Sequence, residues 1–123
     1  MSPTFGRTTP ILRIFSVEKA REFYLGWLGF AVAFEHRFAP DLPLYMGVER
    51  GALELHLSEH HGDASPGAHI RVETVGLDAL HAELTEKRYG YYRPGIETMP
   101  WGRDMTVQDP FSNRITFTER TNP

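Results

Sequence analysis

Three short stretches of this sequence alternate titratable or hydroxyl side chains with apolar ones. Glu54 and His56 alternate with leucines, His69 and Arg71 with isoleucine and valine, and Thr116 stands between isoleucine and phenylalanine. Carboxylate and imidazole groups transfer protons near neutral pH or bind metal ions. Guanidinium and hydroxyl groups hydrogen-bond polar ligands. These five residues are therefore the candidates for proton chemistry, metal binding or ligand recognition.

Such alternation is typical of strands that bury one face and leave the other polar. The apolar faces are suited to packing on helices, so the polar faces must meet water, a ligand or a partner. If two sheets curl around a shared space, the side chains that line it are Arg13, Glu54, His56, His69, Arg71 and Thr116. Charges of both signs favour a polar ligand of mixed charge. An antiparallel sheet with one solvated face gives the same pattern, and the sequence leaves both interpretations open.

Three aromatic residues lie outside the helical patterns, near strand ends or in loops. These are Phe38, Tyr45 and Trp101, and Pro100 and Gly102 fix Trp101 in a turn. Exposed aromatic rings at such places suit stacking against a flat ligand. The alternative for Trp101 is a packing role, at the end of the sheet or across a dimer contact.

The first half of the chain predicts a strand, a helix and three further strands. Residues 10–15 are β-prone, and Ser16 is a suitable N-cap for a helix over residues 17–28, which Gly29 ends. The three strands that follow are predicted at residues 30–38, 44–48 and 52–58, and the last two form a hairpin.

The second half repeats this order after a loop rich in Gly, Asp, Ser and Pro. We predict one domain over residues 1–123, with module one at about 9–58, a linker at about 59–67 and module two at about 68–119. In module two, a strand, a helix and three strands are predicted at residues 68–74, 77–88, 91–98, 104–108 and 114–119. Each half is too small to close a core by itself, so the repeat predicts that the two halves pair.

The composition argues against several classes of protein. The chain has 123 residues, a formal net charge of -3 and no basic block, which disfavours nucleic-acid binding. It has no cysteine, no Gly-x-Ser-x-Gly motif and no phosphate-binding glycine loop, which argues against covalent catalysis. No apolar run approaches the roughly 20 residues that span a bilayer, and the N-terminus has no signal-peptide pattern. We therefore expect a cytoplasmic protein with no membrane partner.

Three sequence pieces resemble a known superfamily. They are FY and LGF within residues 23–30, PWGRD at residues 100–104 and DPFSNRI at residues 109–115. In their order over residues 9–119 they resemble the glyoxalase (vicinal oxygen chelate) superfamily and its bleomycin-resistance branch. The resemblance implies an α+β fold in which two βαβββ modules form a curved mixed sheet around a cleft. It also implies a homodimer, with ligands bound in clefts between sheets.

The resemblance further implies that enzymes of the superfamily hold a divalent metal ion with one side chain from each of four strands. The corresponding positions in this sequence are Thr9, Glu54, His69 and Thr116. Neutral hydroxyls are poor ligands beside imidazole and carboxylate, and two good ligands are fewer than the three of a catalytic zinc site. We therefore expect no metal and no other cofactor. If a metal is bound, Glu54, His69 and His56 are expected to hold it. Glu54 and His69 can alternatively form an acid–base pair.

Two functions compatible with the resemblance remain. The favoured one is a non-catalytic protein that binds and sequesters a bleomycin-like antibiotic and so gives drug resistance. Its expected ligand-binding residues are Phe38, Tyr45, Glu54, His56, His69, Arg71, Trp101 and Thr116. The alternative is a metal-dependent lyase or dioxygenase of the same superfamily. A binding protein for an unrelated small metabolite is a third possibility that the sequence separates poorly from the first.

Overall fold

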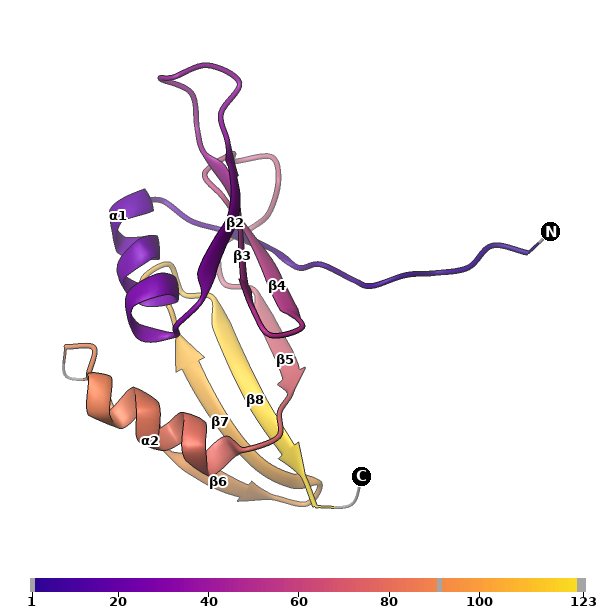
Figure 1. Cartoon of the computed structure of the whole chain (residues 1–123), viewed down its shortest axis with the longest axis vertical. Helices are drawn as coiled ribbons and strands as arrows, with labels where there is room; N and C mark the ends of the chain where they lie inside the picture. The colour runs from indigo at the N-terminus through magenta and orange to yellow at the C-terminus, as the bar shows by residue number, and fades with distance from the viewer. Residues whose placement is uncertain (1, 91, 122–123) are drawn as a thin grey trace.

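The computed structural model describes residues 2–90 and 92–121, and its first half forms one mixed four-stranded sheet with a helix (Figure 1). The elements are β1 (Ile11–Arg13), α1 (Val17–Ala20), the π-helical continuation η1 (Arg21–Trp27), β2 (Ala31–His36), β3 (Tyr45–Arg50) and β4 (Leu53–Ser58). The strand order is β1-β4-β3-β2, in which β1 runs parallel to β4 and the other pairs are antiparallel.

The second half repeats the order strand, helix, three strands. Its elements are β5 (His69–Glu73), α2 (Leu77–Lys87), β6 (Ile96–Met99), β7 (Gly102–Gln108) and β8 (Arg114–Arg120). The strand order β5-β8-β7-β6 matches that of the first sheet, with β5 parallel to β8. The predicted α+β fold of two βαβββ modules is thus confirmed. From here on, module one means β1 to β4 and module two means β5 to β8.

The first helix departs from the regular period that the sequence predicted. Ser16 caps it as expected, because its Oγ accepts a hydrogen bond from the Lys19 amide at 3.1 Å. From Arg21 onward the backbone widens into π geometry, and the Leu28 amide donates to the Phe23 carbonyl at 2.9 Å. This wider turn allows the bulky rings of η1 to enter the core together. The buried rings are Phe23, Tyr24 and Trp27.

Three predicted strands are markedly shorter in the structure, and the one predicted at residues 10–15 is reduced to the three residues of β1. The strand predicted at residues 30–38 is β2, an edge strand whose six residues are all exposed, and Phe30 is buried just before it. The strand predicted at residues 91–98 is reduced to β6. Tyr91, the first residue of the predicted strand, lies outside the described residues. Pro94 and Gly95 explain this late start, since proline cannot donate to a ladder and glycine weakens strands.

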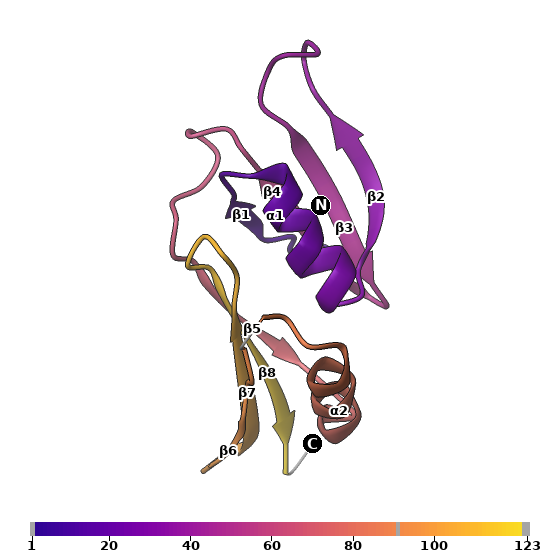
Figure 2. The same ribbon diagram turned by 90° about the vertical axis from the view of Figure 1, so that its left-hand side faces the viewer.

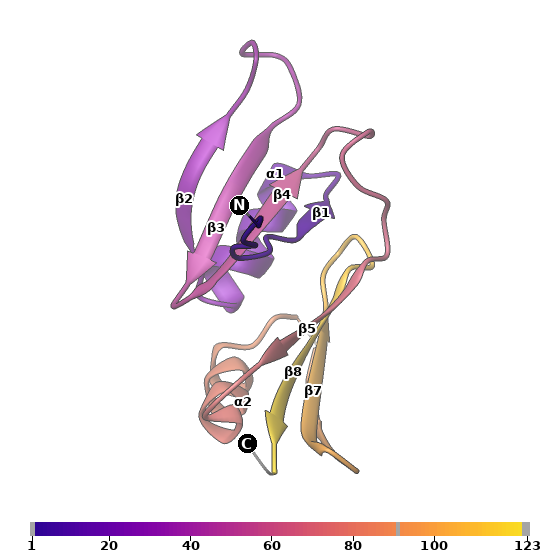
Figure 3. The same ribbon diagram turned by 90° about the vertical axis from the view of Figure 1, so that its right-hand side faces the viewer.

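The modules pack through their helices, which lie on the same side of the two sheets (Figures 1 and 2). Trp27 of module one stacks on Tyr89 with ring centroids 5.7 Å apart, and its Nε1 donates to the Leu84 carbonyl at 3.0 Å. Tyr24 donates its phenol hydrogen to Asp109 Oδ2 at 2.7 Å. The helix side of both sheets is therefore the common core, which leaves the opposite sheet faces uncovered within one chain (Figure 3).

Residues 2–8 have no regular structure and run away from β1 (Figure 1). Among the described residues, no helix has the length and apolar character that crossing a membrane requires.

Removing the Tyr24 hydroxyl tests the contact between modules. Burial, followed by the nearby Asp109 carboxylate, raises the pKa of Tyr24, so the phenol stays protonated and donates its hydrogen. We expect Tyr24→Phe to lower the free energy of unfolding by about 1–3 kcal/mol, because a buried charged acceptor loses a donor. Urea denaturation measures this, with exposed Thr85→Ala as the control. Equal stability of Tyr24→Phe and wild type would contradict the contact.

Candidate functional site

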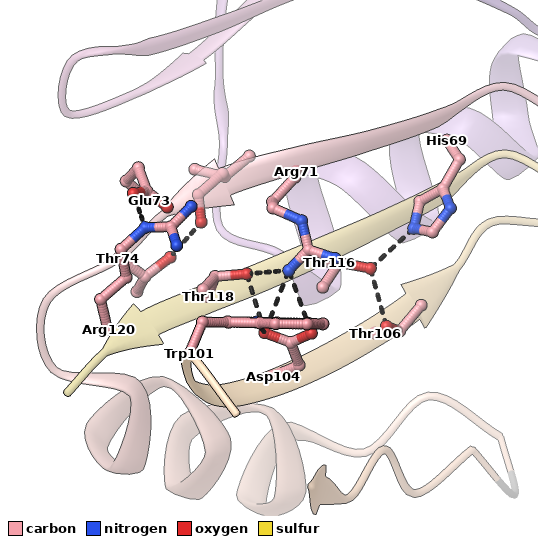
Figure 4. A network of polar contacts seen from close by, with 11 residues as sticks. His69, Arg71, Glu73, Thr74, Trp101, Asp104, Thr106, Thr116, Thr118 and Arg120 are labelled. Carbon is pink, nitrogen blue, oxygen red and sulfur yellow. Dashed lines mark hydrogen bonds and ion pairs between the residues drawn. The ribbon is translucent and has the colours of Figure 1, made fainter. Parts of the chain in front are cut away.

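The uncovered face of module two carries a network of polar side chains on three adjacent strands (Figure 4). Arg71 of β5 lies opposite Thr116 of β8, and Asp104 of β7 lies opposite Thr118 of β8. Directly opposed residues point to the same face of a sheet. The alternation that the sequence showed in β5 and β8 therefore brings these side chains together on the side away from α2.

Asp104 is the centre of this network and is largely buried. Its carboxylate accepts from Arg71 Nη1 at 3.1 and 3.0 Å, from Thr118 Oγ1 at 2.9 Å and from Trp101 Nε1 at 3.0 Å. Burial alone raises the pKa of Asp104, but the hydrogen bonds from Trp101, Arg71 and Thr118 outweigh burial, so the pKa lies below its ordinary value. The carboxylate is thus ionised at neutral pH and holds its donors in place.

Trp101 is held at the edge of this network with much of its ring exposed. Trp101 is 38% exposed, and the Arg71 guanidinium lies 5.2 Å from the ring centroid. Two contacts restrict the Trp101 side chain: the cation–π contact with Arg71 and the hydrogen bond from Nε1 to Asp104. A ring fixed in this way loses little conformational entropy when a flat molecule stacks on it.

His69 lies further along the same face. Its Nε2 is 2.7 Å from Thr116 Oγ1, which is 2.8 Å from Thr106 Oγ1. Burial, followed by the charges of Arg114 and Arg71, lowers the pKa of His69 below its ordinary value of 6.5. The imidazole is therefore mainly neutral at pH 7 and offers either a donor or an acceptor to a ligand.

The uncovered face of module one holds a second group. His56 joins the Tyr45 hydroxyl through Nδ1 and the Glu54 carboxylate through Nε2, each at 2.7 Å. Phe34 stacks on the Tyr45 ring with centroids 6.1 Å apart and meets the His56 ring edge-to-face with centroids 5.1 Å apart. Gly47 makes this possible, because a Cβ there would lie 2.3 Å from the Phe34 ring. Burial, followed by the charge of Asp63, raises the pKa of Tyr45, so its hydroxyl remains protonated.

The predicted site residues thus separate into two groups, and among the described residues no hydrogen bond joins one group to the other. Module one holds Tyr45, Glu54 and His56, and module two holds His69, Arg71, Trp101 and Thr116. Phe38 stands apart in the loop after β2, 76% exposed, beside His36 and His60. Arg13 packs its guanidinium over the Phe15 ring, 4.5 Å from its centroid.

Glu54 and His69, the alternative acid–base pair, do not bond each other within one chain. His56 takes the Glu54 carboxylate because both side chains lie on the same face of β4, two residues apart. His69 belongs to the other sheet and bonds Thr116 instead. Within the described part of the chain, no cluster of three or more His, Asp or Glu side chains is arranged to hold a metal ion. The ligand set of Glu54, His69 and His56 therefore does not fit a metal within one chain.

Several residues of both groups were not singled out from the sequence. Asp104, Thr106 and Thr118 share the strand parity of the predicted polar positions, so alternation in β7 and β8 was a signal that would have found them. Phe34 gave no such signal, because it shares the strand parity of the apolar residues Phe30 and Val32, as a buried strand residue does. Its position over Tyr45 depends on the missing side chain of Gly47.

A larger groove of about 550 Å³ lies between the modules on the helix side. Its walls are mainly apolar, and none of the predicted site residues lines it. Leu28, Phe30, Leu53, Val72, Leu80 and Phe117 are among its lining residues. The charged groups at this groove are already paired, since Arg50 binds both carboxylate oxygens of Glu83 at 2.8 Å. We therefore regard the polar sheet faces as the candidate site.

Comparison with known proteins identifies the class to which this fold and site belong. Residues 2–123 match the sequence model of the family described as "Glyoxalase superfamily protein", so the chain belongs to that family. No curated protein matches the sequence.

Solved structures of two antibiotic-binding proteins and of a bleomycin resistance determinant have the same fold. The bleomycin-binding protein of bleomycin-producing Streptomyces verticillus, solved with copper(II)-bleomycin, is 29% identical, with a TM-score of 0.74 over 96% of this chain and 98% of that one. TnmS3, an antibiotic binding protein from Streptomyces sp. CB03234, is 20% identical, with a TM-score of 0.75 over 98% and 100%. A bleomycin resistance determinant encoded on transposon Tn5 is 20% identical, with a TM-score of 0.74 over 95% and 99%.

Neutralising Asp104 tests the network that holds Trp101. Because the pKa of Asp104 is lower in the folded chain than in the unfolded one, its charge stabilises the fold above the ordinary value of 3.8, and the gain is lost as pH falls through the lowered pKa. We expect Asp104→Asn to be about 1–3 kcal/mol less stable at pH 7. The difference should shrink on acidification. Urea unfolding from pH 7 to strongly acidic pH measures it, and a pH-independent difference would contradict the role of the charge.

Proposed function

We propose that this chain binds an aromatic antibiotic of the bleomycin kind without transforming it, and so sequesters the drug in the cytoplasm. The observation that carries the proposal is Trp101, an exposed indole fixed by Asp104 and Arg71 at the edge of a polar network. The resemblance in fold and the 29% identity to a protein solved with copper(II)-bleomycin support the choice of ligand.

We further propose that the binding cleft forms between two copies of the chain. Within one chain the helices are the shared core, and each polar sheet face is uncovered. The face of module one also exposes apolar side chains, with Ile11 39% and Phe34 38% exposed. In a homodimer with twofold symmetry, the module-one face of one copy meets the module-two face of the other, twice. Such a pairing brings Tyr45 and Glu54 opposite the partner's Trp101.

The alternative of a metal-dependent enzyme has less support. Two of its three expected ligands, Glu54 and His56, bond each other, and the described residues hold no cluster of three side chains arranged for a metal ion. The geometry supports binding through stacking and hydrogen bonds better than metal chemistry.

Titration with bleomycin, free and loaded with copper(II), tests the proposed ligand. We expect saturable binding by calorimetry, and a loss of about ten-fold in affinity in Trp101→Ala, because stacking and buried aromatic area are removed. Trp101→Phe keeps an aromatic ring and should recover part of the affinity. Absence of binding by the wild-type protein, or equal affinity in Trp101→Ala, would refute this form of the proposal.

Mixing two defective variants tests the composite cleft. Trp101→Ala damages the module-two face and Tyr45→Ala the module-one face, so each homodimer should bind bleomycin weakly. If clefts form between copies, random exchange of subunits yields heterodimers with one intact cleft, which restores about a quarter of the sites. Calorimetric titration of the mixture after reversible unfolding counts those sites. A mixture that binds no better than its components would place the whole site in one chain.

A further inference from the structure

A small cavity beside Trp101 has an unusual lining. It has a volume of about 250 Å³, and the residues that line it are Arg71, Trp101 and Arg120 (Figure 4). Arg71 comes from β5 and Arg120 from the end of β8, so the adjacent strands of module two deliver both guanidinium groups to one place. An indole and two arginines together favour a flat molecule that carries hydrogen-bond acceptors.

Both arginines have unused donors. Arg71 bonds the protein through Nη1 alone, to Asp104 and Thr118. Arg120 bonds Glu73 through Nε. Within residues 2–90 and 92–121, no protein acceptor takes a hydrogen bond from Arg71 Nη2 or from either terminal nitrogen of Arg120. A guanidinium has five N–H donors in a fixed plane, so several of them remain for a ligand.

Arg103 provides a contrast on the same module. Its Nη1 donates to Asp78 and its Nη2 to both Asp78 and Glu119, at 2.9, 3.0 and 2.6 Å. Both terminal nitrogens of the Arg103 guanidinium donate to these two carboxylates, and the bonds to Asp78 hold α2 to the sheet. Arg71 and Arg120 keep terminal N–H donors that no protein acceptor of the described residues takes, although Asp104 and Glu73 balance their formal charges. Both guanidinium groups therefore keep N–H donors that can form charge-assisted hydrogen bonds with a ligand.

We propose that this cavity binds a carboxylate carried on an aromatic ring, with the ring against Trp101 and the carboxylate between Arg71 and Arg120. A carboxylate is planar and accepts two parallel N–H bonds from a guanidinium, which suits it to this lining. The proposal goes beyond the proposed function, because it names aromatic carboxylates as a ligand class that the module-two half of the site binds whether or not the chain binds bleomycin. It makes the module-two half of the site selective for an aromatic acid over the corresponding amide or amine.

Three probes with the same ring test this selectivity: 2-naphthoate, 2-naphthamide and 2-naphthylmethylammonium, measured by equilibrium dialysis with the full-length protein. We expect naphthoate to bind about ten-fold more tightly than the amide and more tightly than the amine, because charge-assisted hydrogen bonds exceed neutral ones. Added salt should weaken naphthoate binding and leave amide binding nearly unchanged.

Arg120→Gln should reduce naphthoate affinity to that of the amide without altering amide binding. Lys19→Gln is the matched control, because it removes one positive charge from an exposed residue of α1 in the other module and should leave all three affinities unchanged. Trp101→Ala should weaken all three probes. Equal binding of the three probes, no binding of naphthoate, or a naphthoate affinity that is unchanged in Arg120→Gln would overturn the proposal.

The outcomes separate this proposal from the proposed function. Bleomycin binding that depends on Trp101, without preference for naphthoate over the amide, would overturn the carboxylate subsite and leave antibiotic binding intact. Naphthoate binding that depends on Arg120, in a protein that does not bind bleomycin, would support the subsite and refute bleomycin as the ligand.

Discussion

The carboxylate of Asp109 holds the two modules in place, and the arrangement of the candidate site depends on it. It is only 4% exposed and accepts four hydrogen bonds. Oδ1 receives the amides of Phe111 and Asn113, at 2.8 and 2.9 Å, and Oδ2 receives the Tyr24 hydroxyl and Asn113 Nδ2, at 2.7 and 2.9 Å. A buried carboxylate is tolerated only when its acceptors are satisfied in this way. One side chain therefore closes the turn between β7 and β8 and fixes that turn to the helix of module one.

The register of the β7–β8 hairpin follows from this turn. With the turn closed by Asp109, Asp104 lies opposite Thr118 and Thr106 opposite Thr116. A shift of one residue would send every polar side chain of one strand to the helix side and its apolar side chains to the outer face. The burial of Met105, Val107, Ile115 and Phe117 under the helices opposes such a shift. The same turn that joins the modules thus determines which donors surround Asp104 and where Trp101 is held.

The sequence predicted the faces of the strands better than the partners of individual side chains. Alternation is a local property, so the polar faces of β4, β5 and β8 and the repeated element order could be derived from it. The choice of partner depends on which same-face neighbours the sheet twist and the rotamers bring within bonding distance. For that reason Glu54 could not be assigned to His56 rather than His69, and the role of Asp104 as the anchor of Trp101 was missed. The π geometry of η1 was likewise not predicted, because the spacing of Ala20, Tyr24 and Trp27 follows the ordinary helical period.

The two uncovered faces differ in chemistry, which bears on the ligand of the proposed composite cleft. The module-one face offers a carboxylate, Glu54, behind the His56 ring, together with the stacked rings of Phe34 and Tyr45. The module-two face offers the spare guanidinium donors of Arg71 and Arg120 beside Trp101. A ligand held between two such faces gains most when its cationic part meets the first, its acidic part the second, and its flat ring lies between aromatic residues of both. Mixed charges along a strand face are by themselves equally typical of a solvated sheet. In a cleft between these two faces, the same charges would select ligands that carry both a cationic and an acidic group.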